Sequence, residues 1–378
     1  KLATLQAGQF VETGGYYVKG DAGQAKYLIV AAQAADGYGD HTLANGTVAV
    51  LQANSDIINV LQFGAKGDGI NNEGSEIIAA LTFAENNDKI KEVFIAGGTY
   101  IISVAITIPL GITVSGSSRT NTIISQINTT VHGFILNSFS VIKNLTIQAP
   151  ETNINQTTRG VSYSDTTQVQ IINVRVLYFG YGLFNGQEGG NLNWINRIVN
   201  VRIDNPTKAG VWNDSLNVHD DVYFESVYVR NDSILGASIK TAYHIEGSLN
   251  TRFVNCLQDG GGAVGRYNIP FNIVNSRVSL NGRIENAGAK TNGIAGNIYD
   301  GLVRCIGSTV AIDILQIHNC DPDPSDVSRA AWVYVDSQSQ VSINGLVGNT
   351  PSINNFTSQH VGMSNSSGNT LCDINGSS

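Results

Sequence analysis

The chain has 378 residues, of which 42% are hydrophobic and 14% are charged, so it can bury a large core without a metal or a disulfide framework. Its net charge of -8 argues against a nucleic-acid partner, because neutralising phosphates requires a basic surface. The absence of long apolar runs argues against membrane insertion. The chain begins with Lys1 and its single methionine is Met363, so we expect a trimmed fragment that lacks an N-terminal region.

The first 90 residues predict a small β unit followed by one helix. In residues 1–55, the short apolar runs 27–30 and 48–51 are separated by Asp-Gly and Asn-Gly turns, which is typical of a β cap or neck. Residues 75–87 have helical spacing, since Ile77, Ile78, Leu81 and Ala84 fall on one face. We expect this to be the one substantial helix.

Beyond residue 93 the sequence repeats a pattern of apolar, any, Asn, apolar, any, apolar. The pattern places six residues at one equivalent turn, with spacings of 29, 27, 26, 29 and 20 residues: Asn144, Asn173, Asn200, Ser226, Asn255 and Asn275. Such a period fits one turn of a right-handed parallel β-helix, in which each turn buries its inward residues by stacking on its neighbours. Asparagines stacked at one turn are expected to hydrogen-bond along the axis.

These patterns predict an all-β fold, a right-handed parallel β-helix whose open end is covered by the helix near residues 75–87. The expected units are a cap or neck over residues 1–55, a β-helical catalytic body over residues 56–347 and a C-terminal tail over residues 348–378. In the tail the aliphatic periodicity fades, so it is either loose or ordered by partner subunits.

Several segments resemble a known family. Residues 59–69, 97–100 and 108–116 resemble the entry segment of pectate-lyase-like β-helix proteins. Residues 8–17 and 37–46 resemble the segment before the β-helix in bacteriophage tailspikes, especially capsule depolymerases of Acinetobacter phages. The resemblance is specific for architecture and covers about a third of the chain, residues 8–124.

The resemblance implies a homotrimeric tailspike that binds and cleaves a bacterial capsular or O-antigen polysaccharide without a cofactor. It also implies a place on the virion tail, with attachment to the baseplate or tail through the missing N-terminal region. Residues 70–75 depart from the Thr-Asp-Asp type turn that is frequent in the family. The family has no fixed catalytic motif, so the resemblance assigns no catalytic residue.

Carboxylates are the expected catalytic groups, because glycosidic hydrolysis uses one carboxylic acid to protonate the leaving oxygen and one carboxylate to activate water or attack. The middle turns supply five candidates: Asp221, Glu225, Glu246, Asp259 and Glu285. Glu225 stands where other turns have aliphatic residues, and such irregularities are expected at functional sites. A solvated surface charge is the simpler interpretation of each acid taken singly. We expect the two catalytic carboxyl groups to lie at a separation that is typical of inverting glycosidases.

Aromatic and basic residues are the expected substrate-binding groups, since sugar faces stack on exposed rings and guanidinium groups bind acidic sugars. The predicted set is Trp194, Trp212, Tyr228, His244, Arg283, Arg175 and Arg202. Strand alternation places His244 and Glu246 on the outer face if Tyr243 points inward. Arg175, Arg202 and Arg277 lie two residues past the repeated turn, although surface arginines paired with nearby acids are the simpler interpretation.

Two alternatives remain open. A lyase on the same fold would abstract a proton beside a uronate carboxyl, with Arg252 to neutralise the carboxyl and His244 or Tyr243 as the base. A non-catalytic spike that binds polysaccharide is the second alternative, because a fold alone confers no activity. No metal site is expected, because His219, His244 and His318 stand apart in the sequence.

Overall fold

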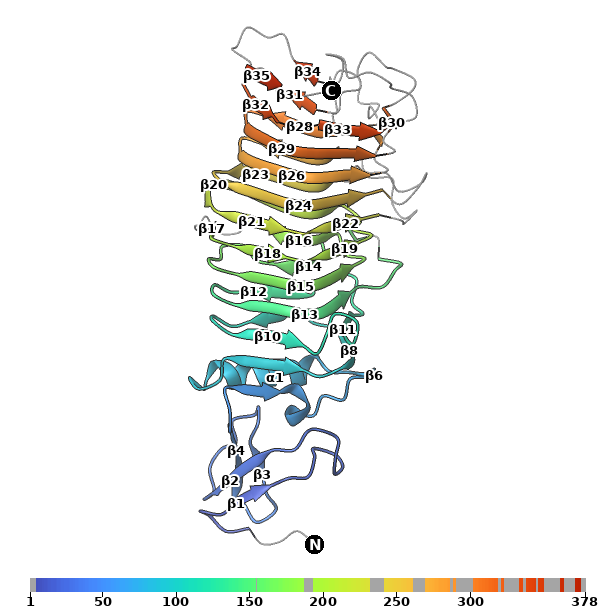
Figure 1. The fold of residues 1–378 in the computed structure, drawn as a ribbon. Coiled ribbons are helices and arrows are strands. Elements are labelled where there is room, and N and C mark those ends of the chain that lie inside the picture. The colour runs from blue at the N-terminus through green and yellow to red at the C-terminus, as the bar shows by residue number, and fades with distance from the viewer. Residues whose placement is uncertain are drawn as a thin grey trace.

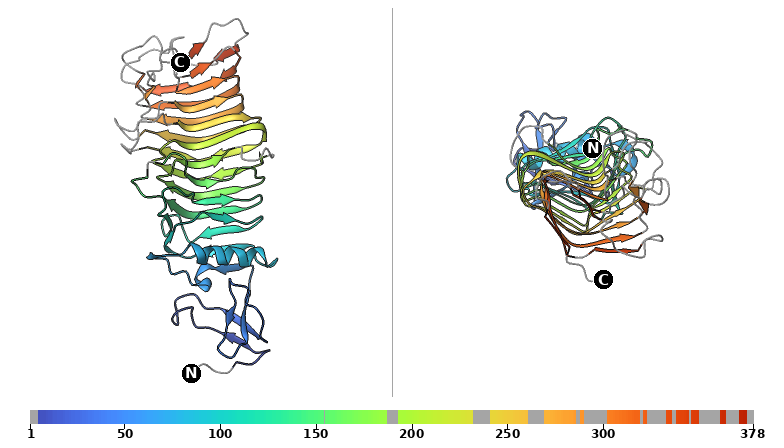
Figure 2. Two further views of the ribbon diagram at one scale, coloured as in Figure 1. Left: turned by 180° about the vertical axis from the view of Figure 1, so that it is seen from behind. Right: turned by 90° about the horizontal axis from the view of Figure 1, so that it is seen from above.

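A computed structural model gives the fold. It describes residues 5–378 except 154, 187–192, 232–240, 261–268, 286–287, 290–301, 319–320, 323–332, 336–337, 345, 350–360, 364–370 and 375–378. The described part is a rod of stacked parallel strands with a small sheet at its N-terminal end (Figures 1 and 2). No helix in this part of the chain is long and apolar enough to cross a membrane.

The N-terminal end is an antiparallel sheet of four strands in the order β1-β2-β4-β3. The strands are β1 (Phe10–Glu12), β2 (Lys26–Val30), β3 (His41–Thr42) and β4 (Val48–Gln52). The short 3-10 helix η1 (Val60–Phe63) and helix α1 (Gly74–Glu85) follow this sheet, and α1 lies across the lower end of the rod (Figure 1).

Two long sheets form the rod. The first sheet contains β5 (Ile57–Asn59), β6 (Asp68–Asn72), β7 (Glu92–Ile95), β8 (Gly98–Ile102), β10 (Thr113–Gly116), β11 (Thr122–Gln126), β13 (Val141–Gln148), β15 (Gln170–Leu177), β18 (Arg197–Val199), β19 (Arg202–Asp204), β21 (Val222–Glu225), β22 (Tyr228–Arg230), β24 (Thr251–Asp259), β26 (Arg277–Glu285), β29 (Thr309–His318), β32 (Gln340–Ile343), β33 (Leu346–Asn349) and β35 (Leu371–Ile374). The second sheet contains β9 (Ile106–Ile108), β12 (Phe134–Leu136), β14 (Arg159–Ser162), β16 (Tyr181–Asn185), β17 (Asn193–Trp194), β20 (Ala209–Asp220), β23 (Thr241–Ser248), β25 (Ile269–Val274), β28 (Val303–Ile306), β31 (Val333–Val335) and β34 (Val361–Met363). The short strands β27 (Gly288–Ala289) and β30 (Asp321–Pro322) pair with each other.

Successive turns pair in parallel and in register, so side chains of one kind stack in columns. Ile147, Val176, Ile203 and Val229 occupy one such inward column and are almost fully buried. Burying aliphatic columns of this kind is the main source of stability in a stacked fold. The predicted class, a parallel β-helix with an N-terminal β cap and one capping helix, is confirmed.

Helix α1 covers the apolar end of the rod. It buries Ile77, Ala80, Leu81 and Ala84, as helical spacing requires. Ile78 was expected on the same face but is 39% exposed, because it lies one position round the helix from Ile77. The helix starts at Gly74 and ends at Glu85, close to the predicted residues 75–87.

The repeated polar turn exists in the first sheet and bends each strand. Asn144, Asn173, Asn200, Ser226 and Asn255 all have left-handed backbones, with φ between 51° and 60°. The Nδ2 of Asn173 donates to Asn144 Oδ1 at 2.9 Å, and the Nδ2 of Asn200 donates to Asn173 Oδ1 at 3.1 Å. Asparagine tolerates this conformation better than most residues, which explains its choice here.

Asn275 does not belong to this turn, so its predicted place in the series is wrong. It lies between β25 of the second sheet and β26 of the first sheet, at a corner where the next turn has Gly307. Both residues have positive φ, which reproduces the local pattern at a different place. Asn275 follows Asn255 by only 20 residues, which is shorter than every other spacing in the series and indicates a different corner of the rod.

Within residues 348–378, two strands continue the stack. β34 pairs in parallel with β31, and β35 pairs in parallel with β32, in the same chain. The expected division into units at residues 55 and 347 stays a prediction, because strand pairing alone does not define independently folding units.

Candidate functional site

The ends of four strands in the first sheet present charged side chains in one column. Asp204 of β19 is in register with Arg230 of β22, Arg230 with Asp259 of β24, and Asp259 with Glu285 of β26. The residues just before them, such as Ile203, Val229 and Ile284, are buried inside the rod, so this column faces outward. We call Asp204, Arg230, Asp259 and Glu285 the strand-end column.

A second outward column lies two residues earlier on the same strands. It contains Arg175, Arg202, Tyr228, Leu257 and Arg283, each in register with the next. Arg277 was expected in this column, but it begins β26 and pairs with Thr309 instead. The misplacement has the same cause as that of Asn275, which lies two residues earlier in the chain.

Asp204 is the most deeply buried carboxylate of the strand-end column. It accepts hydrogen bonds from Arg175 Nε at 2.7 Å and from Arg202 Nε at 2.8 Å. The hydrogen bond to Asp204 raises the pKa of Arg202 above its usual value, while burial opposes this. Two guanidinium groups therefore hold this carboxylate, which suits an anchor for the surrounding face better than a proton donor.

Asp259 and Glu285 keep more contact with solvent. The side chain of Asp259 is 15% exposed, accepts a hydrogen bond from the Tyr228 hydroxyl at 2.9 Å, and has Arg230 Nε at 3.9 Å. Glu285 is 25% exposed and pairs with Arg283 Nη2 at 2.8 Å. Burial, then the hydrogen bond to Asp259, raises the pKa of Tyr228 to about 12, so its hydroxyl stays protonated and donates.

Two hollows lie along these columns. One, of about 400 Å³, is lined by Tyr228, Leu257, Asn281 and Arg283 among others. The other, of about 290 Å³, is lined by Thr146, Arg175 and Arg202 among others. Hollows with a few convergent polar groups are the usual form of small-ligand sites, and these two follow the long axis of the rod.

The second sheet carries a different group of outward side chains. Trp212 stacks on His244 with ring centroids 3.8 Å apart, and Tyr181 contacts Trp212 edge-on at 5.5 Å. Lys208 Nζ lies 5.5 Å from the centre of the Trp212 ring. We call Tyr181, Lys208, Trp212, His244, Glu246, Asn272 and Arg304 the aromatic cluster.

A chain of hydrogen bonds fixes His244 in this cluster. Arg304 Nη1 donates to Asn272 Oδ1 at 3.3 Å, and Asn272 Nδ2 donates to His244 Nδ1 at 2.8 Å. The other ring nitrogen, Nε2, therefore carries the proton and donates to Glu246 Oε2 at 3.2 Å. Burial, then the charges of Arg304 and Lys208, lowers the pKa of His244 to about 4, so the ring is neutral at pH 7.

The structure separates the predicted residues into two groups. Six gather on the first sheet: Asp259, Glu285, Tyr228, Arg283, Arg175 and Arg202. Three gather on the second sheet: Trp212, His244 and Glu246. His244 and Glu246 share the outer face, as expected from the alternation, while Tyr243 points inward and is fully buried.

Glu225 and Asp221 join neither group. Glu225 lies before the Ser226 turn and forms an exposed ion pair with Arg197 at 3.5 Å. Asp221 is an exposed corner residue with φ of 53° and accepts a hydrogen bond from Asn250 Nδ2. Trp194 belongs to β17, and its side chain lies outside the described residues.

The lyase set expected from the sequence is not assembled. The Tyr243 hydroxyl donates to the carbonyls of Val227 and Leu257, inside the rod. Arg252 is exposed on the first sheet, whereas His244 lies on the second. The cations whose charges lower the pKa of His244 are Arg304 and Lys208 instead.

Sequence reasoning missed Asp204, Arg230, Lys208, Asn272 and Arg304. Asp204 follows Arg202 by two residues, so strand alternation alone places both on one face. Arg230 likewise follows Tyr228 by two residues. Two further residues along the strand from Arg202 and from Tyr228 therefore lead to Asp204 and Arg230.

Comparison with known proteins agrees with this architecture. Residues 57–233, just under half of the chain, match a family model described as rhamnogalacturonase A/epimerase, pectate lyase-like. No curated protein matches the sequence.

Solved structures of phage tailspikes have a similar fold. The gp42 tailspike of Acinetobacter phage vb_AbaP_AS12 has a TM-score of 0.67 at 14% identity, over 99% of this chain and 72% of its own. The enzymatically active domain of tailspike protein 2 of bacteriophage CBA120 has a TM-score of 0.65 at 14% identity, over 98% of this chain. The tailspike gp49 of Acinetobacter baumannii bacteriophage Fri1, a capsular polysaccharide depolymerase, has a TM-score of 0.53 at 13% identity, over 100% of this chain and 73% of its own.

The chain spans only 54% of the CBA120 domain. At these identities the likeness is one of fold. By fold, the chain is a pectate lyase-like parallel β-helix whose structural neighbours include phage tailspikes.

Proposed function

We propose that this chain is the β-helical body of a phage tailspike that hydrolyses glycosidic bonds of a bacterial capsular or O-antigen polysaccharide. One observation carries the proposal: Asp259 and Glu285 lie in register on neighbouring turns, two residues beyond Leu257 and Arg283, which line a hollow. The family match and the fold of the Fri1 depolymerase support a polysaccharide substrate. In this proposal residues 56–347 form the catalytic body of a homotrimer on the virion tail.

The spacing of the turns suggests a stereochemical outcome. Neighbouring strands are about 4.8 Å apart, which is close to the roughly 5 to 5.5 Å between the two carboxyl groups of retaining enzymes. Asp204 and Asp259 lie two turns apart, at about the upper limit of the inverting range, but Asp204 is buried between two arginines. We therefore favour retention, in place of the inversion expected from the sequence.

The contacts suggest separate roles for the two carboxylates. Asp259 is held by the Tyr228 hydroxyl and lies near Arg230, both of which favour its ionised form, so it is the proposed nucleophile. Glu285 is bound only by Arg283 in the described contacts, and Arg283 is 42% exposed. A sugar that draws Arg283 away would free Glu285 to act as the acid and then the base.

The test is cleavage of purified capsular polysaccharides by Asp259→Asn and Glu285→Gln variants, followed by mass analysis of the released oligosaccharides. We expect each variant to lose cleavage by more than about 100-fold and to keep binding, since general acid–base catalysis alone contributes about that factor. Glu225→Gln is the matched control, because Glu225 lies before the Ser226 turn and pairs with Arg197. Full cleavage by both amide variants would exclude the pair, and binding without any cleavage by the unaltered chain would favour a non-catalytic spike.

A second candidate is elimination on a uronate at the aromatic cluster. The neutral state of His244 favours it, because a substrate that displaces Asn272 from Nδ1 would leave this nitrogen free to accept a proton at pH 7. Lys208 and Arg304 could neutralise a uronate carboxylate beside it. A lyase leaves an unsaturated product that absorbs ultraviolet light, so absorbance during digestion separates the two reactions, and His244→Ala would abolish only elimination.

A further inference from the structure

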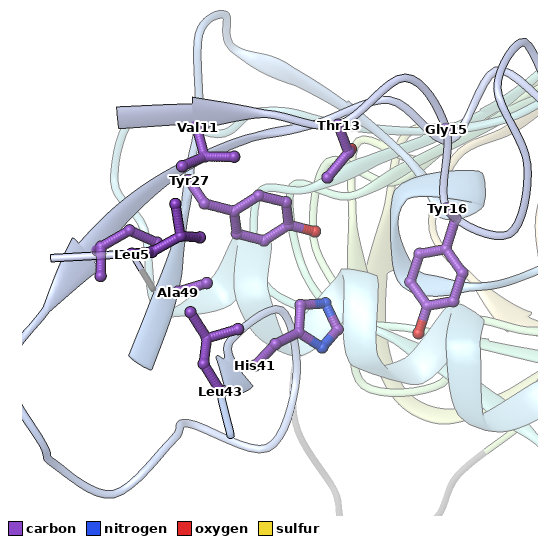
Figure 3. A pocket seen from close by; sticks show the side chains of 10 residues that line it. Leu5, Val11, Thr13, Gly15, Tyr16, Tyr27, His41, Leu43 and Ala49 are labelled. Carbon is purple, nitrogen blue, oxygen red and sulfur yellow. The ribbon is translucent and has the colours of Figure 1, made fainter. Parts of the chain in front are cut away.

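The N-terminal sheet contains a hollow of about 410 Å³ that is distinct from both groups of residues described above (Figure 3). Val11, Ile29 and Leu43 form part of its apolar wall, and Tyr16, Tyr27 and His41 present their rings to it. The volume lies in the usual range for small-ligand sites. No lining residue carries a carboxylate, an ammonium or a guanidinium group.

The three rings are arranged around one space. The ring centroids of Tyr27 and His41 are 5.5 Å apart, and those of Tyr16 and His41 are 6.0 Å apart, both edge-on. The loop that carries Tyr16 is fixed, because the backbone amides of Tyr16 and Tyr17 donate to the carboxylate of Asp21. The backbone that carries Tyr16 is therefore fixed before any ligand arrives.

The polar groups of these rings lack partners within the described part of the chain. Tyr27 is 5% exposed, yet its hydroxyl makes no hydrogen bond with the described residues, and neither do the ring nitrogens of His41. Figure 3 shows the Tyr27 hydroxyl and the His41 ring directed into the space between Tyr27 and Tyr16. Burial raises the pKa of Tyr27 to about 12, so the hydroxyl keeps its proton and can donate.

We propose that this hollow binds one neutral pyranose unit of a glycan. A pyranose has apolar C–H faces that stack on aromatic rings and hydroxyls that pair with a phenol and an imidazole. The uncharged lining disfavours a uronate or a phosphate, whose charge would be left unpaired. The choice of a glycan rests on the proposed function, since a second sugar site on the same chain would raise the avidity for a long polymer.

The test uses the full chain with three probes: D-glucose, D-galactose and N-acetyl-D-glucosamine. Saturation-transfer NMR should detect contact with the ring C–H protons of at least one probe, and titration should give millimolar affinity. Tyr27→Phe removes one hydroxyl and should weaken binding roughly 3- to 10-fold, the range of one net hydrogen bond. His41→Ala removes an exposed ring that contacts Tyr27 edge-on and should weaken binding further. Tyr38→Phe is the control, because Tyr38 is exposed and does not line the hollow.

The proposal is overturned if none of the three sugars receives saturation, or if Tyr27→Phe and His41→Ala bind as well as the unaltered chain. A second outcome also overturns the proposal. If the unaltered chain binds none of the sugars and forms an oligomer that Tyr27→Phe or His41→Ala dissociates, the hollow is a contact between subunits. Glu225→Gln lies outside both groups of site residues and should leave sugar binding unchanged. Failure of the hydrolase proposal would appear as cleavage of capsular polysaccharide by Asp259→Asn, which is a separate result.

Discussion

Replacing Asn173 by alanine tests how much the polar turn stabilises the stack. The Asn173 side chain donates to Asn144 and accepts from Asn200, so alanine removes two hydrogen bonds. Each is worth about 0.5 to 1.5 kcal/mol net, which gives a loss of about 1 to 3 kcal/mol. Alanine at φ of 53° adds about 1 kcal/mol of backbone strain, since most residues other than glycine and asparagine disfavour this region.

The total expected loss for Asn173→Ala is therefore about 2 to 4 kcal/mol. Asn173→Gly loses the same bonds without the strain and serves as the comparison. Guanidinium denaturation measures the loss if unfolding is reversible, and otherwise the unfolding rate at fixed denaturant should rise by about 10-fold per 1.4 kcal/mol. A change of less than about 0.5 kcal/mol in the alanine variant would refute the view that this turn stabilises the stack.

Three further predictions follow from the packing and the titration of single residues. Gly182→Ala should destabilise the chain by about 1 to 3 kcal/mol in denaturant titration, because its Cβ would lie 2.4 Å from Ile203 Cγ2, whereas Gly97→Ala has more room and should be tolerated. His244 is neutral in the folded chain down to about pH 4 but titrates near 6.5 when unfolded, so stability should fall by up to about 3 kcal/mol as pH drops from 6.5 to 4, and His244→Gln should remove that part of the pH dependence. Ser276→Ala deprives the amide of Ser248 of its partner inside the rod, and thermal denaturation should show a loss of about 1 to 3 kcal/mol.

The architecture could be predicted because one polar residue in each turn of the rod adopts a left-handed backbone conformation that asparagine tolerates. Asn144, Asn173 and Asn200 recur at nearly constant spacing, and only a stacked fold puts such residues together. The prediction is wrong at Asn275, because an asparagine with a positive φ occurs at two different corners of the rod. Spacing distinguishes the two corners, whereas local sequence does not.

The arrangement of the site could be predicted only in part. Alternation along a strand fixes which residues share a face, so Arg283 beside Glu285 and His244 beside Glu246 were accessible from the sequence. Which strands are neighbours, and in which register, depends on connections of variable length. For this reason the sequence does not predict the pairing of Asp204 with Arg175, which lies 29 residues earlier.

The variable length of the turns has a consequence for adaptation. At the asparagine turn, stacked polar residues that contact each other are 29, 27 and 29 residues apart in sequence. The spacings are 28, 32 and 31 residues in the column of buried serines, which is Ser248, Ser276, Ser308 and Ser339. The residues of each column stay stacked although the spacing varies. Extra residues are thus absorbed in the links between the sheets, and the periodic wall is unaffected. Such links can therefore lengthen or be exchanged without shifting the phase of the scaffold, so the surface of the rod can diverge while its periodic wall is inherited unchanged.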